Sequence, residues 1–329
     1  MRILYFTDWF SPAFKAGGPI RSAQYLMEMG ISSIEFYVLT SNQDLDGSRL
    51  DVRTDEWIEL EGHNKIMYVS SELSLNRIRS IIAEVNPDGF HINGMFSKEY
   101  SIMPMKVIGE MDRWSDVILS PRGMLEPSAL EFKKWKKKLF LKSVSLLPWW
   151  KRVFWHATHE GEWENIQKSF GQNILGKVVA NPCMKPEGGV VPIEKESGHL
   201  TICHVGRLHP IKGLHVLLES LRNIEADRLN VQIVGPVEDE TYYAQCREIA
   251  GSLPDHIRID WFGPVSPSEV HRVQSLSHAL VLPSQSENFG HAIYENLALG
   301  RPVAIGPNTP WKELEAKGIG YVCELTEAE

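Results

Sequence analysis

Short apolar runs alternate with amphipathic stretches along the whole chain. The runs have the length of buried parallel strands, and the stretches between them place apolar residues every three or four positions, as helices do. Strands are predicted at residues 3–6, 34–39, 65–69, 89–92, 117–119, 177–180, 201–205, 231–234, 257–262, 279–282, 303–305 and 320–325. Helices are predicted after Pro19 and at residues 78–85, 164–170, 214–221, 242–250 and 268–276. A further helix is predicted after Gly290, with Ala292, Ile293, Leu297 and Ala298 on its inward face. This alternation predicts an α/β protein with doubly wound, mostly parallel sheets.

The alternating pattern stops once and then starts again. Residues 181–198 contain three prolines and three glycines and no periodic apolar pattern, which is typical of a linker. The sequence therefore predicts a first domain over residues 1–180, a linker over residues 181–198 and a second domain over residues 199–329.

Residues 281–303 place two carboxylates at the end of a predicted strand. Glu287 follows the apolar strand in a polar turn, and Glu295 lies in the first turns of the next helix. In open α/β sheets, ligands bind at the carboxyl ends of the strands. Amides at a helix N-terminus favour an anion, while carboxylates accept from hydroxyl groups, so a ligand with phosphate and sugar groups fits this mixture. A solvated helix face also produces two glutamates at this spacing.

Composition and charge narrow the class of protein. With 329 residues, 43% of them hydrophobic, the chain is long enough for two cores. A net charge of −8 argues against a nucleic-acid binder. The four cysteines form no CxxC pair, which favours free thiols in a reducing cytosol. The chain begins with a strand instead of a signal peptide and has no apolar run long enough to span a membrane, so we expect a cytoplasmic location.

Glycines and cations follow two other predicted strands. Gly17 and Gly18 follow the first strand, and Pro19 begins a helix there; an ordinary strand–helix turn would look the same. Arg207 and Lys212 follow the strand at residues 201–205, where two cations can neutralise a pyrophosphate without a metal. No Walker A, GxGxxG or HExxH motif is present, and the pair of aspartates at residues 44 and 46 lies in a predicted loop. We therefore expect neither a metal nor a cofactor.

Two further strand ends carry candidate residues for an active-site rim. His91 and Asn93 end the strand at residues 89–92, and Arg122 follows the strand at residues 117–119. His91 is either a rim residue or a strand-end histidine with a satisfied hydrogen bond. Asn93 cannot act as a general base, because an amide does not take up a proton in water. Arg122 in such a place meets either an anion or the carboxylate of a structural salt bridge.

Residues 131–142, with the sequence EFKKWKKKLFLK, form a basic run with interleaved apolar residues. On a helix they predict a cationic face beside an apolar face, as in helices that lie on a membrane surface. A solvated helix that packs its apolar face on the sheet has the same pattern. Peripheral contact with the inner face of a membrane and an ordinary surface helix therefore both stay open.

Taken together, these segments resemble the retaining glycosyltransferases of family four, which have the GT-B fold. The pair of Glu287 and Glu295, with Phe289 and Gly290 between them, is similar to the donor-sugar motif of that family. Residues 206–213 are similar to its strand-end Gly-Arg…Lys-Gly segment, with four residues between the two cations where the family has five. The segments GPVEDE, SENFGH and NTPW resemble the bacterial polysaccharide and lipopolysaccharide branch, and the motifs appear in family order from Arg2 to Val322.

The resemblance implies two Rossmann-like domains that face a cleft and a metal-independent transfer of sugar from a UDP- or GDP-sugar. The acceptor would be a saccharide or a lipid-linked saccharide, on the side of the first domain. Many members of the family have an active-site histidine in the first domain at the position that Asn93 occupies in this chain. The implied catalytic residues are Arg207, Lys212 and Glu287, and the implied donor-binding residues are Gly17, Gly18, Asn288, Phe289, Gly290 and Glu295.

Two other functions fit the same architecture. A catalytically inactive protein would bind a sugar nucleotide without turnover, and a sugar-nucleotide epimerase would convert the donor without an acceptor. Family members usually continue past this point and send a final helix back onto the first domain. We therefore expect a second domain that is shorter than is usual in the family.

Overall fold

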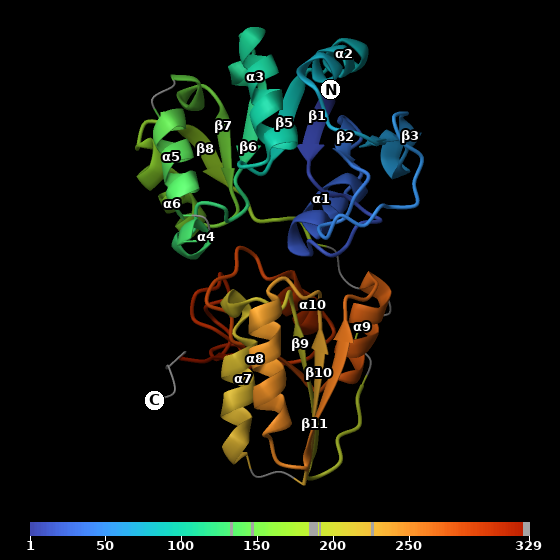
Figure 1. The fold of residues 1–329 in the computed structure, drawn as a ribbon, viewed down its shortest axis with the longest axis vertical. Coiled ribbons are helices and arrows are strands. Elements are labelled where there is room, and N and C mark those ends of the chain that lie inside the picture. The colour runs from blue at the N-terminus through green and yellow to red at the C-terminus, as the bar shows by residue number, and fades with distance from the viewer. Residues whose placement is uncertain (132–133, 146–147, 184–189, 191, 225–226, 325–329) are drawn as a thin grey trace. The chain divides into compact units, whose positions relative to one another are not determined.

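The computed structural model describes residues 1–131, 134–145, 148–183, 190, 192–224 and 227–324. The chain divides into two compact units, Met1–Pro182 and Cys183–Glu329. The division falls inside the predicted linker, of which residues 184–189 and 191 lie outside the described residues. Each unit is built around its own sheet, and each is described by itself below (Figure 1).

The sheet of the first unit has the strand order β3-β4-β2-β1-β5-β6-β7-β8. All neighbouring strands are parallel except β3 and β4, which are antiparallel. The central strands are buried on both faces, as their continuous apolar runs predict. The strands are β1 (Arg2–Thr7), β2 (Glu35–Ser41), β3 (Ile58–Glu59), β4 (Lys65–Val69), β5 (Gly89–Asn93), β6 (Val117–Ser120), β7 (Phe154–Ala157) and β8 (Leu175–Val178).

Helices cover the faces of this sheet and shield its two hydrophobic clusters from water. Ser74 caps the second helix by accepting from the backbone N–H of Arg77, and Asn86 ends it in the left-handed conformation. The carboxyl end of each parallel strand thus leads into a loop at the same edge of the sheet. The helices are α1 (Gly18–Glu28), α2 (Leu75–Val85), α3 (Met103–Glu110), α4 (Pro127–Glu131), α5 (Lys134–Ser145) and α6 (Glu160–Phe170).

The second unit has a smaller, wholly parallel sheet with the strand order β11-β10-β9-β12-β13-β14. Helices α7 and α8 lie side by side over one face of this sheet (Figure 1). The strands are β9 (His199–Val205), β10 (Arg228–Val234), β11 (Ile257–Gly263), β12 (Ala279–Leu282), β13 (Val303–Ile305) and β14 (Gly320–Val322). The helices are α7 (Leu214–Ser220), α8 (Glu240–Gly251), α9 (Pro267–Leu276) and α10 (His291–Ala298).

Most predicted elements are confirmed, and the exceptions have physical reasons. The strand predicted at residues 177–180 lies instead at Leu175–Val178, because its register against β7 pairs Phe154 with Leu175. The β7 strand was not predicted, since its sequence FWHA lacks the aliphatic run that marks the other strands. The helix α3 and the π-helical turn Lys98–Ile102 before it were also not predicted. The last predicted strand ends at Val322, and residue 325 lies outside the described residues.

Candidate functional site

The second sheet has its topological switch point between β9 and β12. From β9 the strand order runs to β10 and β11 on one side and to β12, β13 and β14 on the other. Loops that leave neighbouring strands in opposite directions open a crevice at the carboxyl edge, which is where α/β sheets bind ligands. The loop after β9 carries Arg207 and Lys212, and the loop after β12 carries Glu287. The sequence therefore places the predicted donor residues at the switch point of the sheet.

Glycines let these loops touch backbone to backbone. A Cβ atom at Gly213 would lie 2.0 Å from the carbonyl oxygen of Pro283, and one at Gly235 would lie 1.9 Å from that of Gly206. Both glycines have positive φ angles, 69° and 145°, which other residues rarely adopt. The backbone N–H of Gln285 donates to the carbonyl of Ile211 over 2.8 Å and joins the two loops. The loop cluster is thus held by the backbone.

Each cation of the loop after β9 forms an ion pair with a carboxylate. The Nζ atom of Lys212 lies 2.6 Å from Oε1 of Glu287, and these side chains are only 16% and 9% exposed. The Nη1 atom of Arg207 lies 2.6 Å from Oε2 of Glu238, with exposed fractions of 36% and 34%. Both predicted phosphate ligands are therefore paired here with carboxylates, and an incoming diphosphate would have to compete with them.

The turn of residues 287–290 is fixed by an aromatic cluster. The indole N–H of Trp311 donates to the carbonyl oxygen of Phe289 over 2.6 Å. The Phe289 ring packs against the rings of His291, Tyr294 and Trp311, with centroid distances of 4.8, 6.3 and 5.8 Å. Gly290 has a φ of 79°, and a Cβ atom there would lie 2.7 Å from Ile293. These contacts hold the turn, which also contains Asn288, in front of α10.

The inward face of α10 is more polar than the sequence predicts. Apolar residues of this helix, among them Leu297, were expected inside, but Leu297 is only partly buried. Glu295 is 8% exposed and Asn296 is fully buried. Beneath the loops, His204 of β9 is fully buried and its Nδ1 lies 3.0 Å from the carbonyl oxygen of Val281. Burial and, to a smaller extent, the nearby charge of Lys212 lower the pKa of His204 to about 4, against the opposite effect of the hydrogen bond to Val281.

The first sheet has its own switch point, between β1 and β5. Across it, the Nδ2 of Asn93 donates to the Thr7 hydroxyl over 3.2 Å. Oδ1 of the same Asn93 accepts from Nε of Arg122 over 2.6 Å. The Nη1 of Arg122 donates to the side chain of Asn181. Asn93 and Arg122 therefore lie together, as parts of one hydrogen-bonded network.

A hydroxyl group links two histidines beside Arg122. His91 Nε2 and His156 Nδ1 each lie 2.8 Å from the Ser120 hydroxyl, and His156 Nε2 lies 2.8 Å from the carbonyl oxygen of Val179. Since a carbonyl only accepts, His156 carries its proton on Nε2, Ser120 donates to His156 Nδ1, and His91 donates from Nε2. Burial, followed by the charge of Arg122, lowers the pKa of His91 well below its usual value and also lowers the pKa of His156. Both rings are therefore neutral near pH 7.

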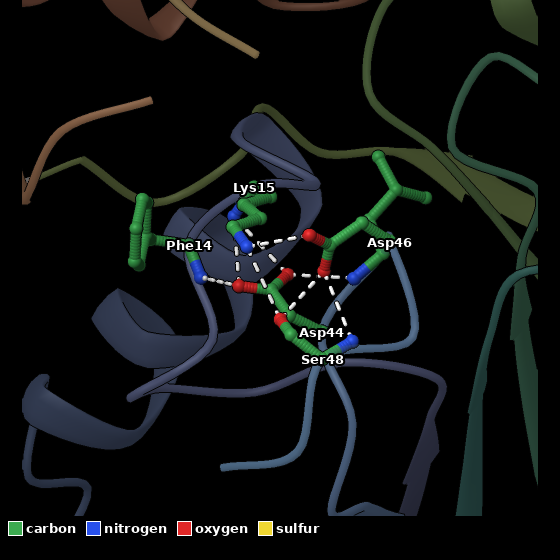
Figure 2. Close-up of polar contacts among 6 residues, drawn as sticks. Phe14, Lys15, Asp44, Asp46 and Ser48 are labelled. Atoms are coloured by element: carbon green, nitrogen blue, oxygen red, sulfur yellow. Dashed lines mark hydrogen bonds and ion pairs between the residues drawn. The ribbon is translucent and has the colours of Figure 1, made fainter. Parts of the chain in front are cut away.

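The glycine loop of the first unit is anchored by an aspartate. Figure 2 shows Asp44 accepting from the backbone N–H groups of Phe14 and Lys15, over 3.0 to 3.3 Å. The Lys15 ammonium lies 2.6 Å from Asp46, which with Ser48 lowers the pKa of that carboxyl well below its usual range. The two aspartates of the D-x-D pair thus hold the loop. Beyond it, Gly17 has a φ of 70° and open space where a Cβ atom would stand, and Gly18 begins α1.

The structure gathers the predicted residues in two places. The set in the second unit lies around the β9 and β12 loops: Arg207, Lys212, Glu287, Asn288, Phe289, Gly290 and Glu295. The set in the first unit lies at the carboxyl edge of its sheet: Gly17, Gly18, His91, Asn93 and Arg122. Among the described residues, no group of three or more metal-binding side chains comes together.

Several residues of these networks were missed. Ser120 and His156 are among them, because no spacing rule brings a residue of β6 next to one of β7. Asn181 was assigned to the linker, and Glu238 lies thirty-one positions from its partner Arg207. Only the sheet topology could have found them.

The basic run at residues 131–142 is mostly helical, as predicted. Glu131 ends α4, residues 132 and 133 lie outside the described residues, and α5 covers residues 134–142. Trp135 is 68% exposed and Leu139 is 59% exposed, one helical turn apart. In the described part of the chain, no helix combines the length and the apolar character needed to cross a bilayer.

The second half of the sequence matches a family model, and two curated proteins are similar to parts of the chain. Residues 191–329 match the family model "Glycosyl transferases group 1". Spore coat protein SA of Bacillus subtilis (strain 168) is 29% identical over 114 residues, which are 32% of this chain and 30% of that protein. D-inositol 3-phosphate glycosyltransferase of Corynebacterium glutamicum (strain R) is 32% identical over 108 residues, which are 31% of this chain and 26% of that protein. The matches thus span less than a third of either relative.

A solved structure with the same fold extends the likeness to both units. Anabaena Alr3699/HepE, solved in complex with UDP and glucose, superposes with a TM-score of 0.65 at 14% identity. The superposition covers 94% of this chain and 81% of that one. The chain therefore has the fold of the GT-B glycosyltransferases, and its residues 191–329 match the family model of the group 1 glycosyl transferases.

Proposed function

We propose that this protein transfers a sugar from a nucleotide-diphosphate sugar to a hydroxyl group of a saccharide or lipid-linked saccharide. The observation that carries this proposal is the arrangement at the second switch point. Arg207 and Lys212 lie there with Glu287, on loops that glycines hold together. Cations suit a diphosphate and carboxylates suit sugar hydroxyls, so one loop cluster offers both halves of the donor a partner.

The bond changes assign a role to each residue. The acceptor oxygen bonds to the anomeric carbon, the bond from that carbon to the diphosphate breaks, and the proton of the acceptor hydroxyl passes to the departing diphosphate. Arg207 and Lys212 neutralise the charge that develops on the departing diphosphate, which lowers the barrier. Glu287 orients the donor sugar and Glu295 holds the ribose, while the backbone at Phe289 and Gly290 makes close contacts. Gly17 and Gly18 are proposed as donor-binding residues as well, on the basis of the motif resemblance.

Retention of the anomeric configuration and the donor base are further parts of the proposal. The motif resemblance supports retention, and no side chain is assigned as a covalent nucleophile. UDP is the first nucleotide to test, since Alr3699/HepE was solved with UDP and glucose. We propose that the acceptor belongs to a cell-surface polysaccharide, because the motifs resemble that branch of the family.

Helix α5 supports a peripheral contact with a membrane surface. Its Trp135 and Leu139 are exposed on adjacent turns, and exposed Lys142 lies one turn beyond Leu139. Exposed apolar side chains beside lysines are attracted to anionic lipid surfaces. A lipid-linked acceptor would be found there, at the cytoplasmic face of the membrane.

Incubation of the protein with UDP-sugars and oligosaccharide acceptors, followed by UDP release and product mass, tests the proposal. We expect nucleotide release that depends on an acceptor and that Lys212→Ala lowers by about a hundredfold or more, as for the loss of one transition-state cation. Nucleotide binding without turnover for any acceptor would favour an inactive binding protein. Conversion of the donor without an acceptor would favour an epimerase.

A further inference from the structure

The guanidinium of Arg122 is held by neutral groups. Its Nε donates to Asn93 over 2.6 Å and its Nη1 donates to Asn181. The other side chains of the network are a threonine hydroxyl, a serine hydroxyl and two neutral histidines. Among the described residues, no ion pair includes Arg122. Its positive charge is therefore fixed in place without a carboxylate bonded to it.

The carboxylate that bonds the backbone next to Arg122 is Glu162, and its hydrogen bonds go to other groups. Glu162 is 1% exposed and accepts from the backbone N–H of Gly123 and from both the N–H and the hydroxyl of Thr158, over 2.6 to 2.7 Å. Three donors satisfy this carboxylate, and none of them belongs to Arg122. Glu162 thus holds the backbone of the loop and leaves the arginine side chain free to meet another anion.

The position and backbone of Arg122 point to a ligand site. Arg122 is partly exposed and follows β6 at the carboxyl edge of the sheet, and its partner Asn93 reaches across the β1–β5 switch point to Thr7. Its φ is 56°, in the left-handed region that non-glycine residues rarely adopt. Such strain persists where the surrounding structure imposes it, and it is common at functional sites. A buried or partly buried cation without a carboxylate also costs free energy that an anionic ligand recovers.

We infer that Arg122, with Asn93 and Asn181, forms a subsite for an anionic group, a phosphate or a carboxylate, of the acceptor. The identification of the ligand as the acceptor rests on the proposed function, whereas the binding of an anion does not. The two amides orient the guanidinium through its Nε and Nη1 atoms. Such a subsite selects phosphorylated or acidic saccharides over neutral ones, because a neutral sugar leaves the guanidinium uncompensated.

Titration with small sugars tests this subsite directly. Glucose 6-phosphate and glucuronate provide the two anionic groups, and glucose is the neutral reference. We expect at least one anionic sugar to bind more tightly than glucose, and Arg122→Gln to weaken its binding by about tenfold or more, as for a lost charge-assisted hydrogen bond. Arg79→Gln removes the charge of a surface arginine that pairs with Glu110 in the same unit, and it should leave the affinity unchanged.

A second variant controls for damage to the fold. Asn93→Asp keeps an oxygen acceptor for Arg122 and supplies the missing carboxylate, which neutralises the cation. The Thr7 hydroxyl, which accepts from Nδ2 of Asn93, can turn to donate to the second oxygen of the aspartate. We expect the thermal stability of this variant to be kept and its anion affinity to fall about as far as in Arg122→Gln. Unchanged anion binding in both variants, or no preference of the native protein for either anion over glucose, would overturn the subsite.

A parallel UDP titration separates this inference from the proposed function. Loss of the anionic sugar in Lys212→Gln, with retention in Arg122→Gln, would place the anion in the second unit and overturn the subsite alone. No UDP binding by the native protein, with the Arg122 effect intact, would leave the anion subsite standing and remove the donor assignment.

Discussion

The ion pair between Lys212 and Glu287 gives the sharpest prediction about the donor site. If Lys212 binds the diphosphate, Glu287 competes with the diphosphate for the ammonium group, since Nζ of Lys212 lies 2.6 Å from Oε1 of Glu287. Glu287→Gln keeps the size and one acceptor oxygen but removes the competing charge. We therefore expect the variant to bind UDP more tightly and to transfer sugar much more slowly, because the donor sugar loses its orienting carboxylate.

The magnitude follows from the burial of the pair. The side chains are 16% and 9% exposed, so removing one charge leaves a mostly desolvated ammonium. Breaking a fully buried pair costs 3–5 kcal/mol and an exposed pair less than about 1 kcal/mol, which brackets this one at about 2 kcal/mol. For a unit of this size, the melting temperature should fall by roughly 4–8 °C. Bound diphosphate restores the missing charge, so the UDP affinity should rise by roughly tenfold.

Differential scanning calorimetry and a UDP titration measure both effects. Glu219→Gln is the matched control, because Glu219 of α7 pairs with Arg222 just beyond the helix, where both side chains are partly exposed. This substitution should change neither quantity appreciably. Lys212→Met should weaken UDP binding. If Glu287→Gln weakened UDP binding as much as Lys212→Met does, the two residues would cooperate in holding the nucleotide, and the competition argued here would be refuted.

Three further predictions concern the scaffold of the site. His204 has a pKa of about 4 in the folded protein and about 6.5 when exposed, so the unfolded state gains the proton first as the pH falls. The free energy of unfolding should therefore be about 2 kcal/mol lower at pH 5 than at pH 7.5. A series of melting curves over this pH range should show that His204→Asn loses this dependence. Gly235→Ala should destabilise the second unit by about 2 kcal/mol or more and abolish UDP binding, because its Cβ atom would collide with the backbone of Gly206. Gly251→Ala is the control, since a Cβ atom at the end of α8 meets open space, and a denaturant titration should show a neutral or stabilising effect. Trp311→Phe removes the indole N–H that donates over 2.6 Å to Phe289 in the turn of residues 287–290. The loss should lower the free energy of unfolding by about 1 kcal/mol and weaken donor-sugar binding in a titration. Equal affinities of the two proteins would show that the turn keeps its shape without this hydrogen bond.

The apolar periodicity predicted most of the fold because it reports local burial. The run at residues 65–69 coincides with β4, whose last four residues are all buried, since a strand buried on both faces shows a continuous apolar pattern. The pattern failed at β7, where Trp155 is fully buried but Phe154 is 41% exposed, so burial comes from one face only and the run is short. It also shifted β8, whose boundaries depend on pairing with β7 and not on its own residues.

The candidate site was predictable as a set of residues but not as a set of contacts. Arg207, Lys212 and Glu287 follow strands, and the rule that ligands bind at strand carboxyl ends singled them out. The sequence did not show that each cation is paired with a carboxylate, nor that Asn93 bonds Arg122 on one side and Thr7 on the other. These contacts join positions that are far apart along the chain, and no periodicity describes them.

The sequence by itself determined the α/β class, the two-domain organisation and the residues that follow most of the strands. Those properties follow from local burial and turn chemistry, which depend on residues that are close together in the sequence. Only the tertiary structure decided that β9 lies beside β12 and β1 beside β5, and thereby which strand ends meet. The charge state of the site follows from that pairing, since Lys212 acquires Glu287 while Arg122 acquires only amides. Strand order is set by the global packing of the sheet, and the chemistry of both edges depends on it.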